Sequence, residues 1–170
     1  RRNIFEKTFA GLRAEGHPFV GLLFAGLILT NDGPKVIEFN CRFGDPETQS
    51  VLVLLKSDLF DLFNACLNKT IASVKLEWAN KYAVGIVVAS GGYPGSVVKN
   101  VEIKGLEQVQ NSGLLVFHGG TVERDGKFYT NGGRVLSVVA LEDTLEKAAA
   151  KAVKGAGMVQ IGKSFFRNDI

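Results

Sequence analysis

Residues 36–42, Val-Ile-Glu-Phe-Asn-Cys-Arg, alternate between apolar and polar side chains, and this alternation limits what the segment can fold into. Successive side chains of a β-strand point to opposite faces of the sheet. One face is therefore predicted to turn three apolar side chains toward a core, those of Ile37, Phe39 and Cys41. The opposite face would present three polar side chains, those of Glu38, Asn40 and Arg42.

The polar face of this strand suits a site for a metal ion and phosphate. Glu38 and Asn40 offer two hard oxygen ligands two positions apart, as Mg²⁺ prefers when it also bridges nucleotide phosphates. The planar guanidinium of Arg42 can pair with phosphate or carboxylate oxygens. A surface strand with one solvated face shows the same alternation without any function, and the strand alone leaves that alternative open.

The residues that follow, Gly44-Asp45-Pro46-Glu47, predict a turn into a helix. Asp45 suits the N-cap and Pro46 the first helical position. The polar row would then end at a helix N-terminus, where backbone N–H groups favour anions. Capping by itself would also account for Asp45.

The composition indicates a folded chain whose partners are small molecules. Of 170 residues, 46% are hydrophobic and 22% charged, which is enough for one core or two small ones. Basic residues number 20 against 17 acidic ones, without a basic run interleaved with aromatics, so we expect no nucleic-acid partner. The apolar segment at 19–29 is too short to span a bilayer, so no membrane partner is expected. Cys41 and Cys66 show no ligand spacing and predict reduced core residues in a cytoplasmic protein.

The first half of the chain reads as a helix, a hairpin and two helices. An apolar stripe from Ile4 to Leu12 predicts the first helix, stopped by Gly16, and nothing before it could cover the stripe, so we expect a fragment of a longer protein. A long buried strand is predicted at 19–30, a turn at 31–34 and an antiparallel partner at 35–41. Two helices are predicted at 46–55 and 58–67, the second capped by Ser57.

The polar, irregular stretch at 68–80 predicts a domain boundary, dividing the chain into domains at 1–75 and 76–170. The second domain reads as mostly β with one helix, which begins near Asp143 with a capping-box-like pattern and ends at Gly155. Its strands are predicted at 83–89, 98–103, 114–118, 121–123, 127–130, 134–140 and 164–167.

Arg134 is the candidate binding residue of the second domain. It follows Gly132 and Gly133, which would let a ligand approach the backbone, and its guanidinium could grip a ribose phosphate. Glycine-rich turns are also ordinary hairpin chemistry. His118 is expected to be structural, because no Ser, Cys or Asp is spaced to make it a base.

The run EFNCRFGDPETQ at 38–49 resembles the signature of the glycinamide ribonucleotide synthetase (phosphoribosylamine–glycine ligase) family, within the ATP-grasp superfamily. Weaker similarities follow the family order over essentially the whole chain, at 19–27, 56–59, 89–95, 116–118 and 130–136. The resemblance implies an α+β fold. It implies part of an ATP-grasp domain at 1–75 and, at 76–170, a small mostly-β C-terminal domain similar to a rudimentary barrel-sandwich hybrid.

The resemblance also implies the reaction, in which ATP-dependent ligation of glycine to 5-phosphoribosylamine proceeds through glycyl phosphate. Glu38 and Asn40 would hold Mg²⁺ or Mn²⁺, and Arg42, Asp45 and Glu47 would be catalytic. Substrate-binding residues would be Gly44, Asp45, Pro46 and Arg134. Family members carry further domains upstream, so the chain by itself is expected to be inactive, and fusion to downstream purine-pathway domains is compatible with the resemblance.

Two alternatives stay open. The first is another ATP-grasp ligase, such as a purine-pathway or biotin-carboxylase-like carboxylase, which shares Glu-x-Asn-x-Arg on a strand but is disfavoured by the Gly-Asp-Pro-Glu continuation. The second is a non-catalytic scaffold that kept the fold and lost the chemistry. The intact row of Glu38, Asn40 and Arg42 argues against that loss.

Overall fold

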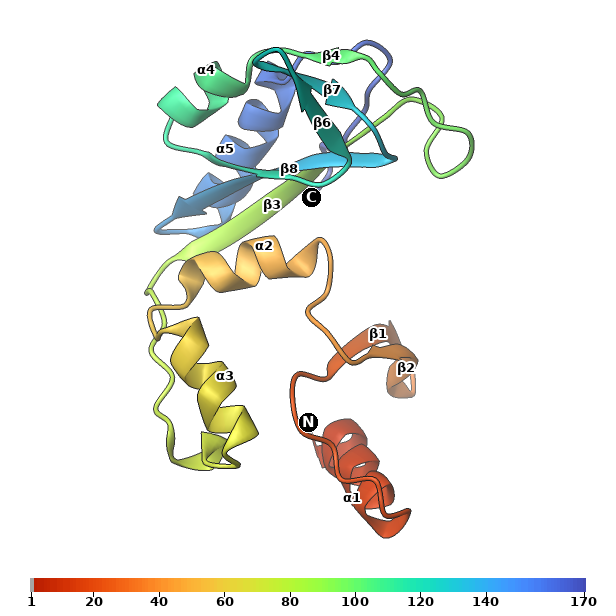
Figure 1. The fold of residues 1–170 in the computed structure, drawn as a ribbon, viewed down its shortest axis with the longest axis vertical. Coiled ribbons are helices and arrows are strands. Elements are labelled where there is room, and N and C mark those ends of the chain that lie inside the picture. Colours follow the sequence, from red (N-terminus) through yellow and green to blue (C-terminus); the bar gives the residue numbers. More distant parts are fainter. Residues whose placement is uncertain (1) are drawn as a thin grey trace. The chain divides into compact units, whose positions relative to one another are not determined.

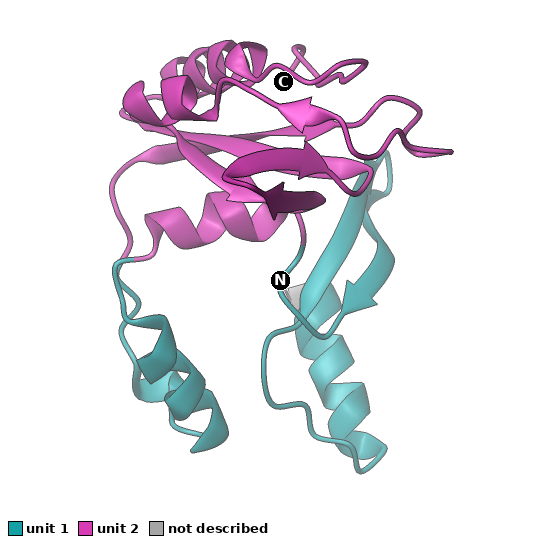
Figure 2. Ribbon diagram, turned by 45° about the horizontal axis from the view of Figure 1, so that its top comes forward, with its two compact units in different colours: residues 1–44, 56–77 teal, residues 45–55, 78–170 magenta. Residues whose placement is uncertain are grey.

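The computed structural model describes residues 2–170, which pack as two compact units (Figure 1, Figure 2). Unit 1 contains the chain up to Gly44 together with Lys56–Glu77, and unit 2 contains Asp45–Leu55 and Trp78–Ile170. The segment that follows the signature's Gly44 therefore packs with the C-terminal unit. None of the described helices is both long enough and apolar enough to cross a lipid bilayer.

Unit 1 holds a helical N-terminal segment, a β-hairpin and a second α-helix. Its elements are a π-helical turn at Arg2–Glu6, α1 (Lys7–Ala14), β1 (Phe24–Thr30), β2 (Gly33–Asn40), α3 (Leu59–Leu67) and a 3₁₀ turn at Ile71–Ser73. The two strands pair antiparallel, as predicted. Gly26 lies opposite Glu38, where a Cβ atom would stand 3.2 Å from Glu38 Cγ, so the absence of a side chain leaves room for the glutamate.

The apolar face of the hairpin differs from the prediction. The first strand begins at Phe24 rather than at residue 19, and the side chains expected in a core are open to solvent. Ile37 is 67% exposed, Phe39 is 40% exposed and Cys41 is exposed as well. Alternation determines which side chains share a face, but burial requires a second layer, and two strands alone do not supply one. The core role predicted for these three residues is therefore wrong.

Helix α3 is capped by Asp58 and not by Ser57. The Asp58 carboxylate accepts hydrogen bonds from the backbone N–H groups of Phe60, at 2.8 Å, and Asp61, at 3.2 Å. Ser57 Oγ instead accepts from the backbone N–H of Glu77 at 2.7 Å. Both residue types are good caps, and only the backbone geometry decides between neighbours.

Unit 2 is built on two antiparallel sheets, which confirms the expected mostly-β C-terminal domain. The larger sheet has the order β3 (Tyr82–Ala89), β8 (Arg134–Glu142), β5 (Leu115–His118). The smaller has the order β4 (Glu102–Ile103), β7 (Lys127–Thr130), β6 (Thr121–Arg124). The helical elements are α2 (Glu47–Val51), a 3₁₀ turn at Leu52–Leu54, α4 (Leu106–Asn111) and α5 (Leu145–Met158).

The core of unit 2 centres on β8, which lies between β3 and β5. Every residue from Val135 to Ala140 is buried. Helix α5 covers one face, with Gly155 against Val138, and α2 covers the other, with Ser50 against Gly85. A Cβ atom at Gly85 would lie 2.6 Å from Ser50 Oγ, so the approach of α2 to the sheet depends on that glycine.

Several boundaries in unit 2 differ from the predictions. Helix α5 continues through Gly155 to Met158, because that glycine serves close packing rather than termination. Helix α4 was not predicted, since six residues are too few to show a helical period. The strand expected at 98–103 is reduced to Glu102–Ile103, and the one at 164–167 to a single bridge between Phe165 and Ala89.

The packing of α5 predicts opposite effects for two glycines of one helix. A methyl group at Gly155 would contact Leu114 and would lie 3.0 Å from Val138 Cγ1, so Gly155→Ala is expected to destabilise the protein by about 1–3 kcal/mol through overpacking. At Gly157 the nearest atom, Phe166 Cζ, would lie 3.9 Å away, so Gly157→Ala should be neutral or stabilising by up to about 1 kcal/mol. Urea unfolding of both variants checks this, and equal effects would contradict it.

Candidate functional site

Glu38 and Asn40 of unit 1 lie on one side of β2, as the alternation predicts. The Asn40 Nδ2 group donates a hydrogen bond to Glu38 Oε1 at 2.8 Å, so the two side chains reach each other across the intervening residue. Glu38 is exposed and Asn40 half-buried. The amide nitrogen, and not the amide oxygen, is the Asn40 atom that contacts the carboxylate.

These two residues fit a Mg²⁺ site in their donor chemistry. Both oxygens are hard ligands of the kind that Mg²⁺ takes, and a magnesium ion keeps several waters or substrate phosphates in its coordination shell. The described residues contain no cluster of three or more His, Cys, Asp or Glu side chains that could hold a metal by themselves.

Arg42 lies two residues past the end of β2, so its position is set by the loop and not by the strand. Its Nη1 donates to the carbonyl oxygen of Phe43 at 2.8 Å, and the side chain is exposed. The Phe43 ring lies 6.2 Å from the ring of Phe63 on α3, which anchors the loop at this point. The guanidinium thus keeps most of its five N–H donors for a ligand.

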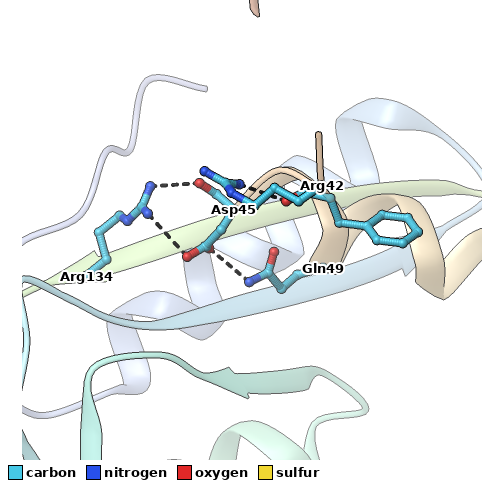
Figure 3. Close-up of polar contacts among 5 residues, drawn as sticks. Arg42, Asp45, Gln49 and Arg134 are labelled. Carbon is cyan, nitrogen blue, oxygen red and sulfur yellow. Dashed lines mark hydrogen bonds and ion pairs between the residues drawn. The ribbon is translucent and has the colours of Figure 1, made fainter. Parts of the chain in front are cut away.

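In unit 2, two polar side chains, those of Arg134 and Gln49, meet the side chain of Asp45 (Figure 3). Arg134 donates from Nη1 to the backbone oxygen of Asp45 at 2.8 Å and from Nη2 to its carboxylate Oδ2 at 3.2 Å. Gln49 donates from Nε2 to the other carboxylate oxygen, Oδ1, at 3.1 Å. Both oxygens of the Asp45 carboxylate are therefore engaged within this unit.

This cluster corrects the predicted helix start. The N-cap of α2 is Pro46, which makes no side-chain cap, and the helix begins at Glu47 and ends at Val51. Asp45 does not cap the helix because Arg134 and Gln49 occupy its carboxylate. Glu47 is exposed and Pro46 half-buried, while Gly44, which ends the unit 1 segment, is buried.

The two glycines before Arg134 serve packing within the chain. A Cβ atom at Gly133 would collide with the ring of Tyr93, and one at Gly132 would lie 3.0 Å from Gly120 Cα. The space predicted for a ligand beside these backbones is therefore filled by the protein. Arg134 itself is 43% exposed in its side chain, and only two of its N–H groups are donated to Asp45.

His118 makes the structural contacts expected of it. Its Nδ1 lies 3.0 Å from Thr121 Oγ1, and the centroid of its ring lies 4.5 Å from that of Phe128, with the two ring planes inclined at 37°. Gln49, by contrast, was missed by the sequence reasoning. Its spacing of four residues from Asp45 was the available signal, because side chains four apart near a helix start can meet.

Comparisons with known proteins agree with this arrangement. The profile of the phosphoribosylglycinamide synthetase C domain matches residues 83–170, and that of the ATP-grasp (A) domain of the same synthetase matches residues 1–48. The chain is 50% identical to the trifunctional purine biosynthetic protein adenosine-3 of Gallus gallus, covering 100% of this chain and 17% of that protein. It is 44% identical to the phosphoribosylamine–glycine ligase of Caldanaerobacter subterraneus subsp. tengcongensis, covering 98% of this chain and 40% of that protein.

Solved structures give the same result. The crystal structure of phosphoribosylamine–glycine ligase from Thermotoga maritima superposes with a TM-score of 0.79 at 36% identity, covering 99% of this chain and 41% of that one. N5-carboxyaminoimidazole ribonucleotide synthetase from the same organism, at 18% identity and a TM-score of 0.57, shares the fold.

The relatives and the fold together identify the chain as part of an ATP-grasp protein, together with the C-terminal domain of that protein. The chain belongs to the phosphoribosylglycinamide synthetase family. It spans about two fifths of the length of the single-function relatives and 17% of the trifunctional one.

The exposure of the Arg134–Asp45 pair predicts a small contribution to stability. The two side chains are 43% and 57% exposed, and exposed pairs contribute about 0–1 kcal/mol. A double-mutant cycle of Arg134→Met and Asp45→Asn, followed by urea unfolding, should give a coupling in that range. Arg167→Met, which removes the exposed pair with Asp169, is the matched control. A coupling above about 2 kcal/mol would show that the pair is retained for stability.

Proposed function

We propose that this chain is the C-terminal part of a phosphoribosylamine–glycine ligase, which joins glycine to 5-phosphoribosylamine with conversion of ATP to ADP and phosphate. The observation that carries the proposal is a similarity over 98–100% of this chain, at 44–50% identity, to proteins named for this activity and for purine biosynthesis. The pair of Glu38 and Asn40 and the cluster at Asp45 supply the chemistry that such a reaction needs.

The proposal includes the assignment of the two domains and the presence of further domains in the same enzyme. We assign residues 1–75 to the ATP-grasp domain and 76–170 to the C-terminal domain. Further domains of the same cytoplasmic enzyme would supply the remaining ATP contacts. Relatives named trifunctional and bifunctional purine biosynthetic proteins make fusion to other purine-pathway domains one of two arrangements that the proposal allows.

In the first step, a glycine carboxylate oxygen attacks the γ-phosphorus of ATP and ADP leaves, which gives glycyl phosphate. Bound Mg²⁺ would neutralise phosphate charge during this transfer. Glu38 and Asn40 would hold the ion, and Arg42 would supply donors to the oxygens that gain charge in the transition state. Arg42 suits this task because its fork can meet two oxygens at once.

In the second step, the amine nitrogen of 5-phosphoribosylamine attacks the acyl carbon, phosphate leaves and the nitrogen loses a proton. Asp45 and Glu47 are the carboxylates assigned to the amine. Gly44 and Pro46 shape the loop that binds substrate, and the undonated N–H groups of Arg134 bind the ribose phosphate. The Arg134–Asp45 ion pair keeps the Asp45 carboxylate in one orientation before substrate arrives.

The decisive experiment is an assay of the polypeptide that carries this chain for glycine-dependent ADP release with 5-phosphoribosylamine. Release that requires both substrates supports the proposal. Release with bicarbonate in place of glycine would favour an ATP-grasp carboxylase, and no release with either would favour a scaffold.

Glu38→Ala tests the metal assignment. The side chain is exposed, so the change should cost less than about 0.5 kcal/mol of stability. The proposal expects kcat to fall by orders of magnitude, because a ligand of the ion that neutralises phosphate is lost. Near-normal turnover with an unchanged Mg²⁺ titration would contradict the assignment. Glu123→Ala, at an exposed strand position of unit 2, is the control.

Arg42→Lys tests the geometry of the guanidinium. Lysine keeps the charge but loses the planar fork, so kcat should fall strongly while the KM for ATP changes little. That pattern identifies a contact made mainly in the transition state. A raised KM for ATP at a preserved kcat would indicate that Arg42 contacts the nucleotide in its bound ground state. Wild-type values of both constants would indicate an exposed residue without a catalytic role.

A further inference from the structure

Gln49 carries a polar atom that the protein itself does not satisfy. Its Nε2 group donates to Asp45, but its Oε1 atom is buried and lacks a hydrogen-bond partner among the described residues. Leaving a buried acceptor unpaired is unfavourable, because the atom loses its hydrogen bonds to water and gains none in the protein. An amide in this position therefore indicates a further donor that the side chains do not supply.

A small cavity lies beside that atom, entirely within unit 2. Its volume is about 20 Å³, and its lining includes Gln49, Asp45 and Arg134 together with Ser137 of β8. A space that holds one water-sized sphere and offers polar partners is sufficient for a single buried water. The cavity is too small for a substrate group.

Ser137 is the second polar group at this cavity. It is 6% exposed and lies at the centre of the sheet, paired with Val87 on β3 and Phe117 on β5. Ser137 also lines the cavity, and its hydroxyl can both donate a hydrogen bond to a water molecule and accept one from it.

We propose that one water molecule binds between Ser137 Oγ and Gln49 Oε1, and that Gln49 is thereby the positioning residue for the Asp45–Arg134 pair. The water donates to Gln49 Oε1 and accepts from, or donates to, the Ser137 hydroxyl. The positioning role rests on the proposed function, in which Asp45 and Arg134 contact the phosphorylated amine substrate. The water site does not.

The water determines which way the Gln49 amide points. An amide can turn over by 180°, which would place its oxygen against the Asp45 carboxylate and lose the donor. A water held by Ser137 favours the orientation in which Oε1 faces the sheet and Nε2 faces Asp45. A metal cation in the same space is disfavoured, because the Arg134 guanidinium lines the cavity as well.

The water site is tested without any activity, by unfolding Gln49→Met, Ser137→Ala and the double variant in urea. If one water links both groups, either single change disrupts it, so the loss in midpoint for the double variant is smaller than the sum of the two single losses. Additive losses would overturn the proposal. Gln110→Met, at an exposed position of α4, is the matched control and should leave the midpoint unchanged.

A high-resolution crystal structure of the protein gives a second measurement that does not depend on how well the variants fold. Density for an ordered water within hydrogen-bonding distance of Gln49 Oε1 and Ser137 Oγ is expected. A direct hydrogen bond between the two side chains, or no density at that position, would overturn the proposal.

The positioning role is tested by kinetics of the complete enzyme. Gln49→Met should raise the KM for 5-phosphoribosylamine about tenfold or more with little change in kcat, since a bond to a charged group is lost from the binding side. Gln49→Glu replaces the donor with a second carboxylate beside Asp45, and like charges repel. Its KM should therefore rise further than that of Gln49→Met, again with little change in kcat.

A merely structural Gln49 predicts a different result, with KM values for Gln49→Met and Gln49→Glu that equal the wild-type value. That outcome would overturn the positioning role while leaving the water site intact. Absence of any ligase turnover in the wild-type enzyme would instead remove the proposed function, and the unfolding cycle would still decide on the water.

Discussion

The burial of β8 on both faces is the constraint on which unit 2 depends. Six consecutive buried residues, from Val135 to Ala140, leave no face of the strand to solvent, so a helix must cover each side. On one side α5 packs close at Gly155, and on the other α2 packs close at Gly85. Because α2 follows directly on the signature residues, the strand that organises the core also determines where Asp45 and Gln49 lie.

Much of this fold could be predicted from local periodicity. The antiparallel hairpin, the strand at Lys127–Thr130 and the start of β8 at Arg134 follow from alternation and turn residues. The predictions that proved wrong concern features that depend on residues distant in the chain. The apolar side chains of β2 share a face as predicted, but their exposure reflects the missing second layer, which no pattern of seven residues can reveal.

The candidate site also has one part that the local sequence pattern predicts and one part that depends on residues distant in the chain. Glu38 and Asn40 share a strand face and a hydrogen bond, which alternation alone predicts. The pair of Asp45 and Arg134 joins residues 89 positions apart, so only the folded sheet brings them together. Two interactions compete for the Asp45 carboxylate. Its position in the sequence suits capping of helix α2, but the carboxylate binds the Arg134 guanidinium, which is the stronger partner, and does not cap the helix.

The two candidate groups, Glu38 with Asn40 and the cluster at Asp45, are held by their neighbours to different degrees. Glu38 and Asn40 hold each other on one strand, and a cation with its own phosphate and water ligands can complete such a pair without a rigid frame. Recognition of an amine and a phosphate on one substrate requires fixed directions, since a misplaced donor loses most of its value. The direction of the Asp45 carboxylate is fixed in this way, because Arg134 from β8 and Gln49 from α2 hold its two oxygens. Since β8 is the central strand of the buried sheet and α2 packs on that sheet, the orientation of the carboxylate depends on the core of unit 2.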